Sequence, residues 1–281
     1  MSVTITRPDK PLFPDGLTKG DLAAYYERVA EVMLPHVRAR PLHMQRFPDG
    51  IEGPELQQKQ VPDYFPAFVN RVEVSRKRGG TVTHATIESA DTLVYLAGQA
   101  CITPHVWLAR ADRLDCPDQL IFDLDPPGGD LGPARDAARR LRALLEEAKL
   151  TPFVKTTGSR GYHVVAPLDR SRSFADVRAY AREVAGELAD RVPDRFTVEQ
   201  RIAARHGRLY LDTARNGYAQ TAVAPYAVRA IDGAPVACPL EWDELGRVDP
   251  QGFTVRNLFR RLARRADPWA DMAQAAAPLP R

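Results

Sequence analysis

The chain has 281 residues, of which 44% are hydrophobic, so it can bury a substantial core and does not have the composition of a disordered protein. Its formal net charge of +3 by itself indicates no class of partner. The three cysteines have no close pair and no CxxC spacing, which argues against a disulfide framework and a zinc site. No long uncharged apolar segment occurs, so we expect a soluble, cytoplasmic protein.

The first half of the chain is expected to mix short strands with two helices. Thr18 and Asp21 have capping-box spacing, so a helix should begin there and stop at Pro35. Short strand signals alternate with turn residues over 41–75. The other expected elements are strands at Val3–Thr6, Val69–Val74 and Thr81–Ile87, a basic turn at Arg76–Gly80 and a short helix at Asp91–Gln99.

The second half shows a clearer pattern of strand, helix, strand, strand, helix, strand. That order predicts an α+β fold with a largely antiparallel sheet and its helices on one face. The tail, Ala273–Arg281, is rich in Ala and Pro and is expected to fray. The elements are strands at Gln119–Asp125, Pro152–Thr156, Tyr162–Pro167 and Arg208–Asp212, and helices at Leu131–Lys149 and Ser173–Val192.

Two acidic residues end the first of these strands. Asp123 and Asp125 are separated by one residue, so their side chains point the same way while Phe122 and Leu124 point into a core. The strand rise places their Cα atoms about 6.5 Å apart. Like charges this close repel each other, and a divalent cation reverses that effect. The pattern therefore favours a metal site over a polar strand end beside a Pro-rich turn.

A glycine turn about thirty residues later carries groups suited to phosphate. Gly158 and Gly161 let the backbone approach an anion closely, and its N–H groups can form a nest. Arg160 adds a guanidinium that suits phosphate oxygens, and His163 begins the next strand. Although such a turn is often only a hairpin, the combination favours triphosphate binding by Thr157, Arg160 and His163.

A third acid completes the pattern. Asp212 ends another apolar strand. Two neighbouring acids and a third from a distant strand form the arrangement that two-metal phosphoryl transfer uses. The sequence therefore predicts a nucleotidyltransferase of the polymerase type, with Asp123, Asp125 and Asp212 as its metal-binding, catalytic residues.

Two other functions stay open on the residues alone. In an aspartyl-phosphate hydrolase, Asp123 would be the nucleophile, Asp125 the acid, and Lys155 and Thr157 supporting groups. In a DNA-end binding module with vestigial catalysis, the protein would bind ends without incorporating nucleotides.

A basic stretch near the C-terminus contains Arg256, Arg260, Arg261, Arg264 and Arg265. If it forms a helix, several of these arginines lie near one face. That face is either a solvated surface or one that tracks DNA.

Matched segments in order along nearly the whole chain resemble the primase–polymerase domain of bacterial ligase D, in the archaeo-eukaryotic primase superfamily. They are Arg7–Pro14, Thr18–Asp21, Tyr25-Tyr26, Arg40-Pro41, Arg46–Gly50, His105–Trp107, Phe122–Pro127, Asp212, Asn216–Tyr218, Ala224–Tyr226, Arg229, Pro239–Leu245 and Asp267–Trp269. The chain contains no ligase or nuclease module, so it resembles a stand-alone form, although it could also be a piece of a longer ligase.

The resemblance implies roles for individual residues. Asp123, Asp125 and Asp212 fall on the family's metal-binding aspartates. The implied nucleotide contacts are Thr157, Arg160, His163, Arg229, Arg205 and His105, and the implied contacts to a DNA 5′-phosphate are Lys10 and Lys19. Leu56 and Gln57 stand where the family usually carries two adjacent aromatics, and Gln45 stands where lysine is common.

The resemblance also implies a fold and a function. It implies one two-lobed domain over 1–270: an N-terminal β-rich lobe (1–118), a catalytic RRM-like lobe (119–230) and a C-terminal return (231–270), followed by a frayed tail at 271–281. Such enzymes use Mn²⁺ or Mg²⁺ and nucleoside triphosphates to fill gaps and extend broken DNA ends. They often prefer ribonucleotides and work beside Ku and an ATP-dependent ligase in non-homologous end joining, which would place this protein at the bacterial nucleoid.

Overall fold

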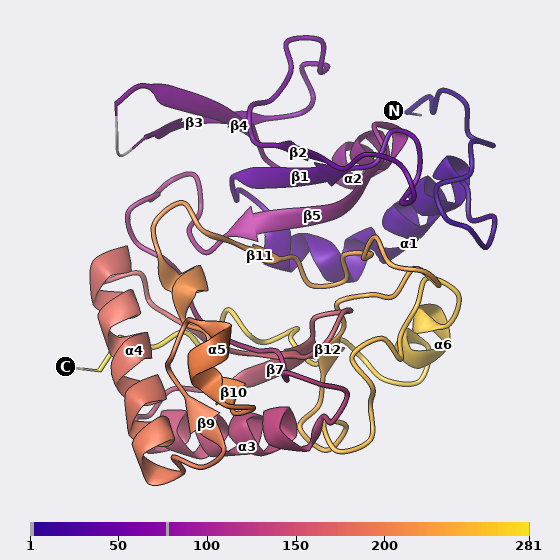
Figure 1. Cartoon of the computed structure of the whole chain (residues 1–281). Coiled ribbons are helices and arrows are strands. Elements are labelled where there is room, and N and C mark those ends of the chain that lie inside the picture. The colour runs from indigo at the N-terminus through magenta and orange to yellow at the C-terminus, as the bar shows by residue number, and fades with distance from the viewer. Residues whose placement is uncertain (1–2, 77–78, 281) are drawn as a thin grey trace. The chain divides into compact units, whose positions relative to one another are not determined.

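The computed structural model describes residues 3–76 and 79–280, and the chain divides into two compact units (Figure 1). Unit 1 comprises Met1–Leu114, Thr221–Ala237 and Phe253–Ala263. Unit 2 comprises Asp115–Gln220, Cys238–Gly252 and Arg264–Arg281. The C-terminal return that the sequence suggested over 231–270 is therefore shared between the two units.

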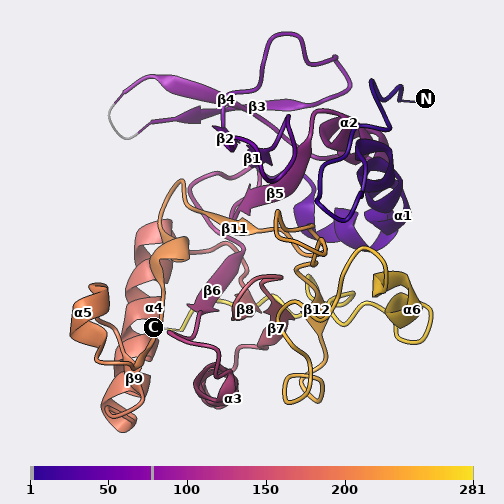
Figure 2. The same cartoon turned by 45° about the vertical axis from the view of Figure 1, so that its right-hand side comes forward.

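Unit 1 is built on a four-stranded antiparallel sheet in the order β11-β5-β1-β2, with a separate β3-β4 hairpin (Figure 2). The strand β5 was not predicted, because almost all of its residues are buried and no alternation marks it. The strands are β1 Leu42–Arg46, β2 Leu56–Gln58, β3 Arg71–Ser75, β4 Thr81–Ala85, β5 Cys101–Trp107 and β11 Thr221–Val223.

Three expectations for unit 1 either need correction or concern residues outside the description. Residues 3–6 form no strand; Lys19 Nζ instead donates to the carbonyl of Thr6 at 2.9 Å. The strand expected to reach Ile87 ends at Ala85. Residues 77 and 78 of the predicted basic turn Arg76–Gly80 lie outside the described residues.

The helices of unit 1 are α1 (Lys19–Val37), α2 (Ala90–Gly98) and α6 (Leu258–Leu262). The predicted capping box of α1 is present, since Thr18 and Asp21 each accept a hydrogen bond from the other's backbone N–H. The predicted stop at Pro35 is wrong: the helix continues to Val37 because the proline lies in its last turn. Tyr26 anchors α1 to the sheet by donating to the carbonyl of Ile102 at 2.6 Å.

Unit 2 contains the strand–helix–strand–strand–helix order expected from the sequence. Its antiparallel sheet runs β12-β7-β8-β6, and a short parallel pair, β9 and β10, follows α4. The elements are β6 Gln119–Leu124, α3 Gly132–Glu147, β7 Phe153–Thr156, β8 Tyr162–Pro167, α4 Phe174–Arg191, β9 Phe196–Thr197, α5 Ile202–Arg205, β10 Leu209–Tyr210, the 3₁₀ turn η1 Ala214–Asn216 and β12 Pro239–Leu240.

Helices α3 and α4 pack against this sheet and against each other. Leu141, Leu144 and Leu145 of α3 are buried, as their spacing predicts. In α4 the buried residues Val177, Ala181 and Val184 recur at helical spacing. The predicted α+β class with an antiparallel sheet is confirmed. Within the described part of the chain, no helix is both long and apolar enough to cross a membrane.

The C-terminal part differs from what its composition suggested. Ala277 pairs with Leu168 and Leu279 is buried, so residues up to 280 are held against unit 2 rather than frayed. The basic stretch does not form one helix, since α6 ends at Leu262. Its arginines are dispersed into separate contacts: Arg256 pairs with Asp15 at 2.8 Å, Arg261 is buried over Phe253, and Arg265 pairs with Asp243 at 3.4 Å. A single DNA-tracking helix face is therefore excluded.

Candidate active site

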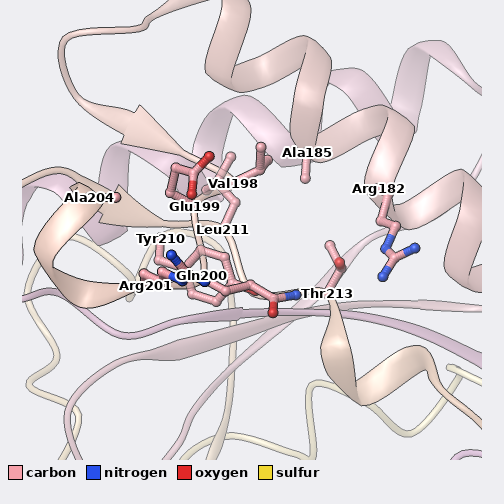
Figure 3. A pocket seen from close by; sticks show the side chains of 10 residues that line it. All are labelled: Arg182, Ala185, Val198, Glu199, Gln200, Arg201, Ala204, Tyr210, Leu211 and Thr213. Atoms are coloured by element: carbon pink, nitrogen blue, oxygen red, sulfur yellow. The ribbon is translucent and has the colours of Figure 1, made fainter.

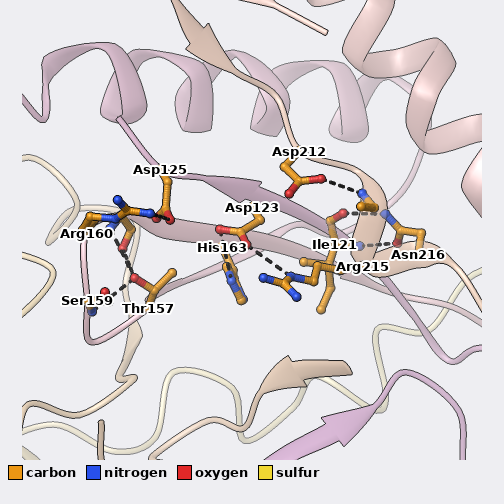
Figure 4. Close-up of polar contacts among 12 residues, drawn as sticks. Ile121, Asp123, Asp125, Thr157, Ser159, Arg160, His163, Asp212, Arg215 and Asn216 are labelled. Carbon is orange, nitrogen blue, oxygen red and sulfur yellow. Dashed lines mark hydrogen bonds and ion pairs between the residues drawn. The ribbon is translucent and has the colours of Figure 1, made fainter. Parts of the chain in front are cut away.

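Four polar side chains lie in one row across the sheet of unit 2. His163 in β8 is directly opposite both Asp123 in β6 and Lys155 in β7. Asp123 in turn pairs with Asp212 through two backbone hydrogen bonds of 2.9 and 3.2 Å. Directly opposed residues of antiparallel strands point to the same face, so all four side chains emerge together. Figure 4 shows Asp212, Asp123 and His163 side by side.

The charged state of Asp123 is set by its neighbours. Nε2 of His163 lies 3.4 Å from its Oδ1, and Nε of Arg215 donates to its Oδ2 at 3.4 Å. Burial by itself would raise the pKa of Asp123, but His163 and Arg215 outweigh burial and hold this pKa well below its usual value. The carboxylate is therefore ionised at neutral pH.

His163 is the neutral member of the row. Burial, and next the ammonium group of Lys155, lower the pKa of His163 to about 4, although Asp123 favours the charged imidazolium. The imidazole is therefore uncharged at neutral pH, and Arg215 supplies the formal counter-charge beside Asp123. Lys155 is only 1% exposed, so its side chain lies inside the unit, directly across from His163.

The Thr157–Gly161 turn is held closed by its own threonine. The Thr157 hydroxyl accepts hydrogen bonds from the backbone N–H groups of Ser159 and Gly161, both at 3.2 Å, and lies 3.1 Å from the Gly161 carbonyl. The sequence suggested that the N–H groups of this turn form an anion nest. Two of them instead donate to Thr157, because the hydroxyl lies within reach inside so tight a turn.

Asp125 follows β6 and faces this turn. Its Oδ2 lies 3.3 Å from Nη2 of Arg160. The Arg160 side chain is 73% exposed, so its guanidinium remains open to solvent while it neutralises the carboxylate. Asp125 and Asp123 are thus each paired with a different arginine (Figure 4).

The segment after Asp212 is fastened to the middle of β6 (Figure 4). Oδ1 of Asp212 accepts a hydrogen bond from the Ala214 N–H at 2.7 Å. Asn216, which is fully buried, accepts from the Ile121 N–H at 2.9 Å and donates to the Ile121 carbonyl at 2.7 Å. This side chain satisfies the edge of β6 as a neighbouring strand would, and so fixes Asp212 beside Asp123.

Replacing Asn216 with alanine is expected to destabilise the protein by about 2–4 kcal/mol, because it leaves both buried polar groups of Ile121 without a partner. Asn216→Asp keeps an acceptor for the Ile121 N–H but turns a carboxylate oxygen toward the buried carbonyls of Ile121 and Thr213, so it should destabilise the protein at least as much. Urea unfolding of the three proteins measures the difference. An alanine variant with an unchanged unfolding midpoint contradicts this role.

The acidic residues suit a hard divalent cation. In the described residues, no group of three or more His, Cys, Asp or Glu side chains is already arranged to hold a metal ion, because each aspartate is turned toward a local donor. Oδ1 of Asp123 is buried on the face shared with Asp212 and accepts no hydrogen bond of ordinary geometry. Carboxylate oxygens are the donors that Mg²⁺ and Mn²⁺ prefer. The donor set therefore fits the predicted ions.

Arg205, a predicted nucleotide contact, lies at the end of α5 in unit 2. Its guanidinium donates to the carbonyls of Glu199 and Gln200 and stacks over the Tyr210 ring, 4.3 Å from its centroid. Tyr210 lines a cavity of about 600 Å³ that also reaches Thr213, the residue after Asp212 (Figure 3). Arg205 thus supports Tyr210, a residue of this cavity's wall, while its guanidinium is bound to backbone carbonyls.

The other predicted contacts belong to unit 1. His105 lies in β5 opposite His43 of β1, with ring centroids 6.0 Å apart. The backbone N–H of Arg229 donates to the Pro235 carbonyl. Lys10 forms an ion pair of 2.7 Å with Asp49. Lys19 is buried, and its pKa is lowered first by burial and then by the neighbouring cations Arg7, Lys10 and Arg46.

Sequence reasoning missed Arg215 and gave Lys155 a part only in the hydrolase alternative. Lys155 joins the row because of strand register, and a lysine in the middle of a short buried strand was the available signal. The contact between Arg215 and Asp123 spans 92 positions in sequence, so no local pattern could reveal it.

The antiparallel sheet carries Asp123 in β6, with Asp125 just after that strand and Asp212 paired beside it. The model of a family described as "LigD, primase-polymerase domain" matches residues 18–269, which places the chain among primase–polymerases, a class of nucleotidyltransferases. The chain belongs to the LigD primase–polymerase family. This confirms the resemblance drawn from the sequence.

Individual relatives agree with this assignment. The chain is 33% identical over 274 residues to the multifunctional non-homologous end joining protein LigD of Mycolicibacterium smegmatis, and 32% identical over 281 residues to that of Pseudomonas aeruginosa. These matches cover 96% of this chain but 35% and 33% of the relatives, so the chain spans about a third of their length. A solved polymerase domain of Mycobacterium tuberculosis ligase D in complex with DNA matches 98% of this chain and 99% of its own, with a TM-score of 0.91 and 32% identity.

Proposed function

We propose that the protein is a template-directed, two-metal nucleotidyltransferase that fills gaps and extends ends at DNA breaks in non-homologous end joining. The observation that carries the proposal is the direct pairing of Asp123 with Asp212 on one sheet face, beside Asp125 and the Thr157–Gly161 turn. The similar domain solved with DNA supports DNA as the substrate, and the names of the relatives support the repair pathway.

Asp123 and Asp125 would anchor Mn²⁺ or Mg²⁺, with Asp212 completing the site nearest the primer 3′-hydroxyl. Such ions, when bound, lower the pKa of the attacking hydroxyl and neutralise charge on the leaving pyrophosphate. Asp123 meets the first requirement of this role, since it is ionised at neutral pH. Arg215 holds the same carboxylate from the side of η1 and so restricts its orientation.

The incoming nucleoside triphosphate would bind along the β7–β8 turn. Arg160 is exposed and carries donors that suit phosphate oxygens, so it can leave Asp125 when a triphosphate arrives. Thr157 fixes the shape of the turn, and neutral His163 can donate a hydrogen bond without repelling a cation. Arg229, Arg205 and His105 complete the proposed nucleotide contacts.

Lys10 and Lys19 would hold the 5′-phosphate across the gap. Both lie in one group of neighbouring cations. Within that group, Lys10 also forms an ion pair with Asp49. Ku and an ATP-dependent ligase are the partners that this function calls for, and their common location would be the nucleoid in the cytoplasm. A preference for ribonucleotides belongs to the same proposal.

Extension of a primer across a one-nucleotide gap with a 5′-phosphate tests the function. We expect incorporation that depends on the template base and on Mn²⁺ or Mg²⁺, with ribonucleotides used faster than deoxynucleotides. Tight binding of ends without incorporation under either metal would instead identify a DNA-end binding module. Hydrolysis of simple phosphate esters without DNA would identify an aspartyl-phosphate hydrolase.

A further inference from the structure

An exposed aromatic ring stands on a rigid part of unit 1. The loop that follows β2 contains Tyr64, which is 64% exposed, next to Phe65, which is 3% exposed. Phe65 packs edge-on against Tyr95 of α2 at 5.0 Å, and its backbone carbonyl accepts a hydrogen bond from Arg71 at 2.7 Å. The loop is therefore well anchored, and the exposure of Tyr64 is not that of a loose terminus or an unsupported loop tip.

The orientation of Tyr64 is fixed by two contacts. Its ring lies edge-on to Phe65, with centroids 5.3 Å apart. Its hydroxyl accepts a hydrogen bond of 3.3 Å from Nη1 of Arg46. Arg46, which is only 9% exposed, is itself held by Gln58 at 2.6 Å and by the Gln99 carbonyl at 2.8 Å. The Tyr64 side chain is thus exposed to solvent while two contacts define its position.

Arg46 also belongs to a group of four cations, Arg7, Lys10, Lys19 and Arg46, which we term the Lys19 cluster. The N-terminal loop brings the group together: the backbone N–H of Lys19 bonds to the Lys10 carbonyl, and Lys10 reaches Asp49, three residues after Arg46. The other three cations lower the pKa of Lys19, after burial itself. Such mutual repulsion among neighbouring cations is relieved by an anion that binds beside them.

An anchored ring beside a group of cations is the combination that recognises unpaired nucleic acid, because cations bind the phosphates while a ring stacks on a base. Leu56, opposite Arg46 in the edge strand β2, and its neighbour Gln57 offer no ring there. We propose that Tyr64 is a stacking platform for an unpaired base of the DNA whose phosphate binds the Lys19 cluster. The inference rests on the proposed function in taking gapped DNA as the ligand and the Lys19 cluster as the contact to its phosphate.

The test uses a gapped duplex with a 5′-phosphate and 2-aminopurine as the unpaired template base, titrated in EDTA without nucleotide. Wild-type protein is expected to quench the fluorophore on binding. Tyr64→Ala should lose the quenching and raise Kd about 5- to 100-fold, as loss of one base stack does. Tyr64→Leu should behave like alanine, and Tyr64→Phe like wild type within about twofold, because stacking needs the ring and not the hydroxyl.

Salt titration separates stacking from charge. Tyr64→Ala should leave the slope of log Kd against log salt unchanged, whereas Lys19→Gln should reduce its magnitude by about 0.9. Tyr180→Ala, a tyrosine of α4 in unit 2, is the matched control and should bind like wild type. Unchanged quenching and Kd in Tyr64→Ala, or a phenylalanine variant as weak as alanine, overturns the proposal. Because the titration contains neither metal nor nucleotide, its result does not depend on whether the protein transfers nucleotides. Loss of stacking in Tyr64→Ala likewise leaves the transfer chemistry untested.

Discussion

Asp123→Asn is expected to lower nucleotide incorporation by on the order of 10³-fold or more while leaving DNA binding within about threefold of wild type. The change keeps the shape of the side chain and removes the charge that would hold a cation, an interaction worth several kcal/mol in the transition state. It also leaves Arg215 facing a neutral amide. Single-turnover primer extension and fluorescence anisotropy with gapped DNA give the two quantities.

The same substitution at Asp190, on the exposed surface of α4, is the matched control and should leave both quantities unchanged. Normal extension by Asp123→Asn would remove Asp123 from the chemistry. Equal loss of DNA binding and extension would show instead that the carboxylate positions DNA rather than the reacting atoms.

Much of unit 2 could be predicted because its local signals agree with its tertiary structure. The bounds of β8 were predicted to the residue, and the β6 strand was predicted with one extra residue, Asp125. Proximity of Asp123 and Asp125 follows from alternation alone. Their approach to Asp212 required a hypothesis about chemistry, because Asp212 lies 89 positions after Asp123 and follows a strand of only two residues, β10 Leu209–Tyr210.

The features that sequence could not supply are those decided by long-range packing. The β5 strand, Cys101–Trp107, is buried along nearly all its length and so lacks a pattern of period two. The arginines of the basic stretch, at Arg256, Arg261 and Arg265, look equivalent in sequence and differ because each meets a different partner. The closed form of the Thr157–Gly161 turn depends on where one hydroxyl points, which composition does not determine.

Gly161→Ala is expected to destabilise the protein by roughly 1–3 kcal/mol and to lower incorporation about 100-fold. A Cβ at this position would lie 2.0 Å from the Leu124 carbonyl oxygen and 2.8 Å from Oδ1 of Asp125. Both contacts are far inside van der Waals distance, and the nearer one is to backbone, so no rotamer change can relieve it. Either the end of β6 moves away with Asp125, or the β7–β8 turn opens and loses its bond from Gly161 to Thr157.

Gly128→Ala is the matched control, because it lies in the loop that follows β6 and a Cβ there meets no atom within 4 Å. Its stability should stay within about 0.5 kcal/mol of wild type, and its activity should be unchanged. Thermal unfolding and primer extension on both variants test the argument. If Gly161→Ala folds and incorporates like Gly128→Ala, the close packing of this turn against β6 does not position Asp125, and the proposed link between the turn and the carboxylates is lost.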